Sequence, residues 1–142
     1  MTTAGWLRVA AGLTLFNAVG HTLGAVLAQP SGPPEAALRD AMRGYRVVMM
    51  GVERSYWDFY LGSGWAITVL VLTMAAVMWL LASVARRNAQ AVRPIVAALA
   101  AGYAGLTLVS VLYFVTAPTV NLALITVSLA VAMMKSGGDK LP

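Results

Sequence analysis

Four long apolar stretches divide the chain, and the charged residues collect between them. The stretches cover about residues 6–28, 58–84, 91–115 and 118–134. A helix needs about 20 apolar residues to cross the ~30 Å hydrocarbon core of a bilayer, and each stretch reaches or approaches that length. Lipid cannot hydrogen-bond to the backbone of an open strand, so helices are the expected form. The pattern predicts an all-α membrane protein whose single domain, residues 1–142, is a bundle of four transmembrane helices.

The composition supports this class and excludes an ordinary soluble domain. Of the 142 residues, 60% are hydrophobic and 11% are charged. One soluble core of this size could not cover that much apolar surface. The chain contains no cysteine, which excludes disulfides, thiol catalysis and cysteine metal sites.

The positions of the charges indicate a membrane orientation rather than nucleic-acid binding. The net charge is +5, and several basic residues flank the spans on the side that the termini share: Arg8, Arg86, Arg87, Arg93, Lys135 and Lys140. The first connection balances its arginines with acids: Arg39, Arg43, Arg46 and Arg54 against Glu35, Asp40, Glu53 and Asp58. By the positive-inside rule, we expect a multi-pass inner-membrane protein with both termini cytoplasmic and the first connection outside. We expect no nucleic-acid partner.

The first connection carries an amphipathic pattern over about residues 33–52. Pro33 and Pro34 followed by Glu35 are typical of a helix start. Apolar residues then recur at steps of three and four beside a basic stripe: Leu38, Met42, Tyr45, Met49 and Val52 against Arg39, Arg43 and Arg46. We expect an external amphipathic helix on the membrane face or over the bundle mouth, with Gly44 as a point where it can break. A plain lid and a cap that gates a ligand are both open.

The only histidine lies inside the first span. One helix face carries the polar and small residues of this span: Thr14, Asn17, His21 and Gly24. Ionisable side chains are costly in a bilayer and usually face a bundle interior or a wet cavity, so His21 marks a candidate site. A cleaved secretory signal is the competing interpretation, because the small residues 25–28 resemble a cleavage site. The length of the apolar run, and its interruption by Asn17 and His21, favour a retained helix.

Charged and aromatic residues are concentrated where the second span begins: Glu53, Arg54, Tyr56, Trp57, Asp58, Phe59 and Tyr60. The aromatic residues are typical of the interfacial belt of membrane proteins. Carboxylates at this depth need a physical reason. Asp58 begins a helix face that continues through Gly62 and Trp65, and we expect this face to look into the bundle. We interpret Gly62 and Gly64 as points of close helix approach, because their spacing has no phosphate-loop signature.

Alternating spans bring the polar residues to one level in the outer half of the predicted bundle. The third and fourth spans contribute a polar stripe: Tyr103, Thr107, Ser110, Tyr113, Asn121 and Ser128. We expect a polar pocket there, beneath the amphipathic helix, in which His21 and Asp58 interact directly or through one water. The candidate ligand-binding residues are Asn17, His21, Arg54, Asp58, Tyr60, Tyr113 and Asn121.

Three functions fit such a pocket. Apolar walls with a few placed polar groups suit a small lipophilic or amphipathic ligand, which is the leading hypothesis. The alternative is an intramembrane enzyme on a lipid-like substrate, with His21 as acid–base and Asp58 or Glu53 assisting. The third is a structural scaffold. We expect no metal site, because one histidine with Asp58 or Glu53 is an incomplete ligand set. Haem on a single axial histidine stays open, and the sequence identifies no cofactor.

Two segments resemble a known class of proteins. Residues 16–24 read Phe-Asn-Ala-Val-Gly-His-Thr-Leu-Gly, and residues 53–64 read Glu-Arg-Ser-Tyr-Trp-Asp-Phe-Tyr-Leu-Gly-Ser-Gly. They resemble uncharacterised small bacterial four-span integral membrane proteins over the first two spans. The resemblance implies four spans in a bacterial inner membrane and implies no activity. The partners we expect are the lipid bilayer and a small lipophilic ligand, and the sequence leaves a homo-oligomer open.

Overall fold

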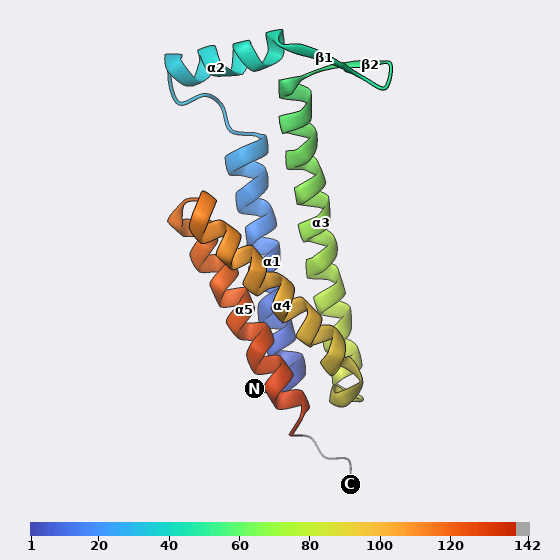
Figure 1. Ribbon diagram of the computed structural model, residues 1–142. Coiled ribbons are helices and arrows are strands. Elements are labelled where there is room, and N and C mark those ends of the chain that lie inside the picture. The colour runs from blue at the N-terminus through green and yellow to red at the C-terminus, as the bar shows by residue number, and fades with distance from the viewer. Residues whose placement is uncertain (139–142) are drawn as a thin grey trace. The chain divides into compact units, whose positions relative to one another are not determined.

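The computed structural model, drawn in Figure 1, describes residues 1–138. Its contacts divide the chain into two compact units. The first unit comprises Met1–Ala18 and Val71–Pro142, and the second comprises Val19–Leu70. Each unit is described by itself. The elements, in chain order, are α1 (Thr3–His21), a π-helix (Thr22–Val26), α2 (Pro33–Gly44), β1 (Arg46–Met49), β2 (Val52–Ser55), α3 (Tyr56–Ala85), α4 (Ala89–Tyr113) and α5 (Thr116–Ser136). Both α1 and α3 contribute to each unit.

Four helices are long and apolar enough to cross a membrane, which confirms the all-α prediction and the number of spans. Their bounds are Thr3–Val26, Tyr56–Ala85, Ala89–Tyr113 and Thr116–Ser136. They agree with the predicted spans to within a few residues. The reason is that both the sequence prediction and the assignment of spans to the structure depend on the length of each apolar run. The chain is therefore built as a multi-pass membrane protein.

The core of the first unit consists of apolar side chains from all of its helices. Figure 1 shows α4 and α5 side by side, joined by the short connection at Phe114 and Val115. The largest buried apolar side chains come from α1, α3, α4 and α5: Leu7, Met78, Val92, Val96, Ile125 and Leu129. Small residues lie among them and let the helices approach closely: Ala10, Ala11, Ala82 and Ala132. Packing of large against small side chains therefore holds this unit together.

Basic residues cluster at one end of the first unit. Figure 1 shows the start of α1, the α3–α4 turn and the end of α5 at this end. The Arg8 guanidinium carbon lies 5.4 Å from the centre of the Trp79 ring. The Arg93 guanidinium lies beside Gly137, where it complements the negative end of the α5 dipole. Lys140, counted above with the basic residues, lies outside the described residues.

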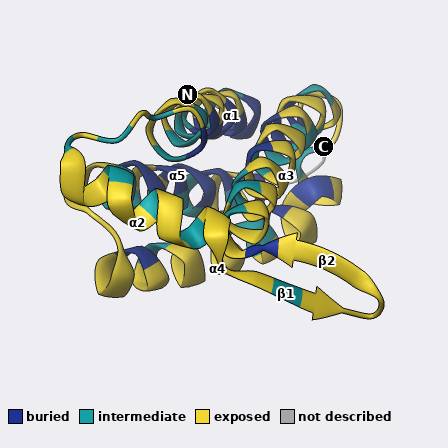
Figure 2. Ribbon diagram, turned by 90° about the horizontal axis from the view of Figure 1, so that it is seen from above, coloured by how far each residue is buried: buried dark blue, intermediate teal, exposed yellow. Residues whose placement is uncertain are grey.

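In the second unit, α2 is followed by a β-hairpin, which corrects the helix predicted over residues 33–52. The helix ends at Gly44, and the antiparallel strands pair Met49 with Val52 across a two-residue turn. Both turn residues have positive φ, 53° at Met50 and 81° at Gly51, as a primed hairpin turn requires. The apolar spacing predicted a helix, but the β-branched valines and the tight turn favour strands. Figure 2 shows α2 and both strands as mostly exposed.

Candidate functional site

His21 is the last residue of α1, directly before the π-helix. Its Nε2 lies 3.1 Å from the Gly64 carbonyl oxygen on α3, and the side chain is half-buried. A carbonyl oxygen only accepts, so Nε2 is the protonated nitrogen. In the neutral imidazole, Nδ1 is then left as an acceptor. π-Helical turns are frequent at functional sites, so both the side chain and the backbone mark this position.

A close-packed seam continues from His21 along the π-helix and α3, and we call it the His21 seam: His21, Thr22, Val26, Gly64 and Thr68. The Thr22 and Thr68 hydroxyl oxygens lie 3.0 Å apart. A Cβ on Gly64 would come within 2.9 Å of Val26 Cγ2. The expected close approach at Gly64 is therefore confirmed. At Gly62 the same expectation is wrong, because a Cβ there would meet nothing within 4 Å. The face of Asp58, Gly62 and Trp65, which we expected to look into the bundle, is exposed.

Asp58 caps its own helix. Its Oδ2 accepts a hydrogen bond from the Ser55 backbone nitrogen at 2.8 Å, and its backbone nitrogen donates to Ser55 Oγ at 3.1 Å. These reciprocal bonds form a capping box at the start of α3. Among the described residues, His21 bonds to Gly64 and Asp58 bonds to Ser55, so the direct His21–Asp58 contact expected from the sequence is not formed.

Glu53 and Arg54 lie on the exposed hairpin and have partners there. Glu53 Oε1 lies 3.7 Å from Arg46 Nε, and both side chains are more than half exposed. Arg54 Nη1 donates to the backbone carbonyl of Glu53 at 2.8 Å. Neither carboxylate expected to assist His21 is therefore bonded to it.

Arginines from α2 and aromatic residues from α3 form a group that we call the arginine–aromatic cluster: Arg39, Arg43, Trp57 and Tyr60. The guanidinium carbons of Arg39 and Arg43 lie 4.7 and 5.3 Å from the Trp57 ring centre. Trp57 and Tyr60 stack with ring centres 5.3 Å apart. Tyr60 also donates to the Ala25 carbonyl of the π-helix at 3.5 Å, which connects the cluster to the His21 seam. The sequence showed the basic stripe and the aromatic belt separately, and only the fold joins them.

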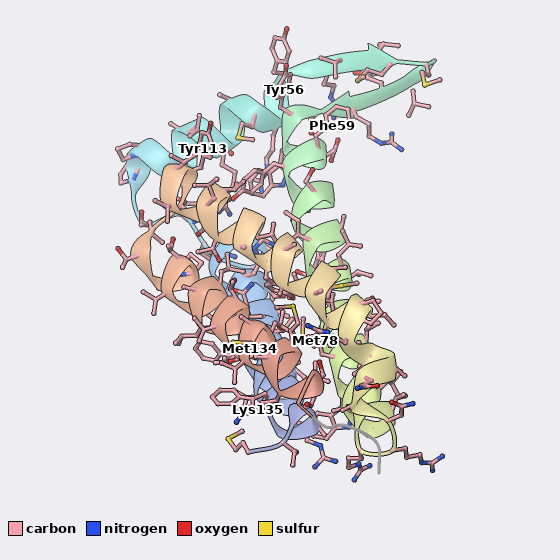
Figure 3. The ribbon with its side chains drawn as sticks, turned by 60° about the horizontal axis from the view of Figure 1, so that its bottom comes forward. Tyr56, Phe59, Met78, Tyr113, Met134 and Lys135 are labelled. Carbon is pink, nitrogen blue, oxygen red and sulfur yellow. The ribbon has the colours of Figure 1, made fainter. Side chains whose placement is uncertain are left out.

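Aromatic contacts also fix the base of the hairpin to α3. The rings of Tyr45 and Tyr56 meet edge to face with centres 5.1 Å apart, and the Tyr56 backbone nitrogen donates to the Tyr45 carbonyl. Figure 3 shows Tyr56 and Phe59 where α3 leaves the hairpin. This anchoring keeps the start of α3 in register with the end of α2.

The other predicted residues belong to the first unit. Asn121 is buried and its Nδ2 donates to the Leu13 carbonyl at 3.3 Å, while its buried Oδ1 accepts no hydrogen bond from the described residues. Asn17 is half-buried. Tyr113 is 77% exposed, at the end of α4 (Figure 3). Asn121 therefore links α5 to α1, whereas Tyr113 contributes to an exposed surface.

Several hydroxyl groups of the first unit are paired within it. Thr14 Oγ1 lies 3.3 Å from the Tyr103 hydroxyl and donates to Met78 Sδ at 3.7 Å. Ser110 and Thr119 hydroxyl oxygens lie 2.7 Å apart across the α4–α5 pair. These bonds account for much of the predicted polar stripe as links between helices. A pocket shared with His21 would need both units, and it stays a prediction.

The candidate chemistry therefore concentrates in the second unit, at the His21 seam and the arginine–aromatic cluster. A comparison of the chain with protein-family models, curated proteins and solved structures finds no match.

Proposed function

We propose that this multi-pass protein of the bacterial inner membrane binds a small lipophilic or amphipathic ligand through its second unit, at the His21 seam. The observation that carries the proposal is the hydrogen bond of His21 to α3, next to the π-helix. Its Nε2 is bonded to the Gly64 carbonyl, and the ring lies beside an irregular helical turn, where Nδ1 of a neutral ring would be an acceptor. A polar acceptor among apolar helix faces is what an apolar ligand with one hydroxyl or amide group needs.

The partners of the carboxylates favour binding over catalysis. General acid–base chemistry with His21 would need a second group within hydrogen-bond reach of the same substrate. Asp58 is engaged with Ser55, and Glu53 lies near Arg46. An intramembrane enzyme on a lipid-like substrate remains the second candidate, because a neutral Nδ1 is also a base.

The distribution of charge supports a membrane orientation with both termini cytoplasmic. In the described part of the first unit, every charged side chain is basic: Arg8, Arg86, Arg87, Arg93 and Lys135. By the positive-inside rule, basic residues that flank membrane spans stay on the cytoplasmic side. The chain has no cysteine, so a single cysteine introduced at Ala36 on α2 reports directly on the side. Labelling from outside supports the orientation, and labelling from the cytoplasm alone contradicts it.

Native mass spectrometry of gently extracted protein tests the binding proposal. We expect wild-type protein to retain a lipid-like molecule, and His21→Gln to lose it while its thermal stability stays nearly unchanged. Glutamine can donate an amide hydrogen to the Gly64 carbonyl, but its acceptor, Oε1, lies farther along the side chain than Nδ1 and is not basic. Asp58→Asn is the matched control: it weakens the α3 cap and is expected to keep the bound molecule.

Three results would overturn the binding proposal. Retention of the molecule by His21→Gln, at the wild-type level, would place it elsewhere. Loss of the folded state in His21→Gln, with no bound molecule in the wild type, would make His21 a packing element of a scaffold. Conversion of the bound molecule by wild-type protein, abolished in His21→Gln, would select the enzyme instead.

A further inference from the structure

We infer that the ligand of the second unit is an anionic amphiphile whose phosphate or carboxylate head is bound by Arg43 at the arginine–aromatic cluster. The inference rests on the proposed ligand-binding function and specifies the chemistry of the ligand. It starts from two guanidinium groups, of Arg39 and Arg43, that converge on one indole ring, of Trp57.

The two arginines differ in how many of their donors are used. Arg39 Nη2 donates to the Ala28 carbonyl at 2.9 Å, which fixes α2 against the end of the π-helix segment. Arg43 makes one long polar contact within residues 1–138, from Nη1 to Asp40 Oδ1 at 3.4 Å, and both side chains are more than half exposed. A guanidinium carries five N–H donors in a planar fork that matches a carboxylate or a phosphate. Arg43 is therefore the cation available to a ligand.

The charges around Arg43 leave room for an anion. Like charges four residues apart on a helix repel, so Arg39 and Arg43 disfavour each other. Glu35, the other acid on α2, accepts from the Ser31 backbone nitrogen and hydroxyl at 2.7 and 2.6 Å, and those bonds hold it at the helix start. An anion between Arg39 and Arg43 would relieve their repulsion. Of the described acids, Asp40 is the one paired with Arg43, and this exposed pair is of the kind that contributes little.

Exposed apolar side chains lie close in sequence to a residue that the cluster contacts. Leu23 on the π-helix and Leu27, its C-cap, are exposed, and Leu27 directly precedes Ala28, to which Arg39 is bonded. Trp57 and Tyr60 stand at the start of a span, the level at which such rings meet lipid headgroups. An amphiphile could bind Arg43 through its anionic head and cover Leu23 and Leu27 with its acyl chain. A soluble anion could bind Arg43 but would leave the leucines exposed.

The test measures retention of defined lipids in detergent by native mass spectrometry. Arg86 and Arg87 line an open depression at the end of α3 together with Ser83, and would also attract anionic lipid. The measurements therefore use an Arg86→Gln/Arg87→Gln background. In it, we expect dioleoyl phosphatidylglycerol to be retained and dioleoyl phosphatidylcholine to be retained weakly. Adding Arg43→Gln should weaken phosphatidylglycerol retention by about tenfold, the value of one charge-assisted contact.

Controls separate a ligand contact from a structural one. Arg46→Gln removes the same charge from the hairpin and should leave retention unchanged, and both variants should keep the melting temperature of the background. Arg43→Lys should recover only part of the binding, because lysine lacks the planar fork. A structural cation–π contact alone would lower the melting temperature of Arg43→Gln without changing lipid preference, and that result overturns the inference.

The remaining outcomes distinguish an amphiphile from a free anion, and distinguish failure of this inference from failure of the proposed function. Displacement of phosphatidylglycerol by millimolar inorganic phosphate would identify a free anion and overturn the amphiphile. Equal retention of both lipids, lost in His21→Gln but not in Arg43→Gln, would overturn the anionic head and leave the proposed function standing. Retention of neither lipid, by protein that also extracts without a bound molecule, would remove both.

Discussion

The two units differ in where their charge and their backbone irregularity lie. The described residues of the first unit carry only basic charges, and its helices are linked by paired hydroxyls over an apolar core. The second unit balances its arginines against acids, and it contains the π-helix and the positive-φ turn. Because irregular backbone and balanced charge are more typical of functional sites than regular helices are, the comparison leads us to expect stability from the first unit and the proposed site in the second.

The largest expected effect lies in the core of the first unit. Ile125 is completely buried, whereas its neighbour Leu124 is 50% exposed on the same helix. Ile125→Ala should destabilise the protein by about 2–5 kcal/mol, because it leaves a cavity among packed helices. Leu124→Ala is the control and should cost much less. Thermal unfolding in detergent measures both, and equal effects would contradict this assignment of the core.

A smaller effect should follow when the His21 seam is overpacked. Gly64→Ala places a Cβ against Val26 and should destabilise the second unit by about 1–3 kcal/mol. Val26→Ala in the same chain should restore much of the loss, since it removes the clashing methyl group. Gly62→Ala meets nothing and should be neutral or slightly stabilising. If Gly62→Ala and Gly64→Ala behave alike, the seam is packed differently.

Two substitutions in the hairpin turn should change the stability of the hairpin in opposite directions. Gly51 has a positive φ, and Gly51→Ala should weaken the hairpin by about 1 kcal/mol. Met50 also has a positive φ, so Met50→Asn should strengthen the same turn, because Asn-Gly is the preferred pair there. Limited proteolysis at the turn reads out both. Cleavage that responds to neither substitution would contradict the turn geometry.

The smallest effect concerns the start of α2. Hydrogen bonds from the Ser31 side chain and backbone, with a smaller contribution from Arg39, hold the pKa of Glu35 below its ordinary value. A depressed pKa means that the contribution of Glu35 to stability is present above its unfolded pKa, and is lost as pH falls through the folded pKa. Ser31→Ala removes the hydroxyl hydrogen bond to Glu35 and should raise the pKa of this carboxyl group. A carboxyl NMR titration measures it, and an unchanged midpoint would contradict the contact.

Sequence patterns were sufficient for the four spans and insufficient for the connection between the first two. The stripe through Tyr45, Met49 and Val52 is compatible with a helix, and the decisive feature, two consecutive positive-φ residues, has no counterpart in hydrophobic spacing. The capping role of Asp58 was readable, because Ser55 stands three residues before it at the start of an apolar run. The cation–π contact of Arg43 with Trp57 was not readable, since it depends on how α2 folds back on α3.

The central claim is that the ligand is bound by the second unit while the first holds the fold. Hydrogen–deuterium exchange tests it most directly, on delipidated protein in detergent before and after addition of lipid extract from the cells that express it. The account predicts slower exchange in Val19–Leu70, greatest from His21 to Ala28 and around Trp57, with α4 and α5 unchanged. Slower exchange centred on α4 and α5, or none anywhere, would contradict it.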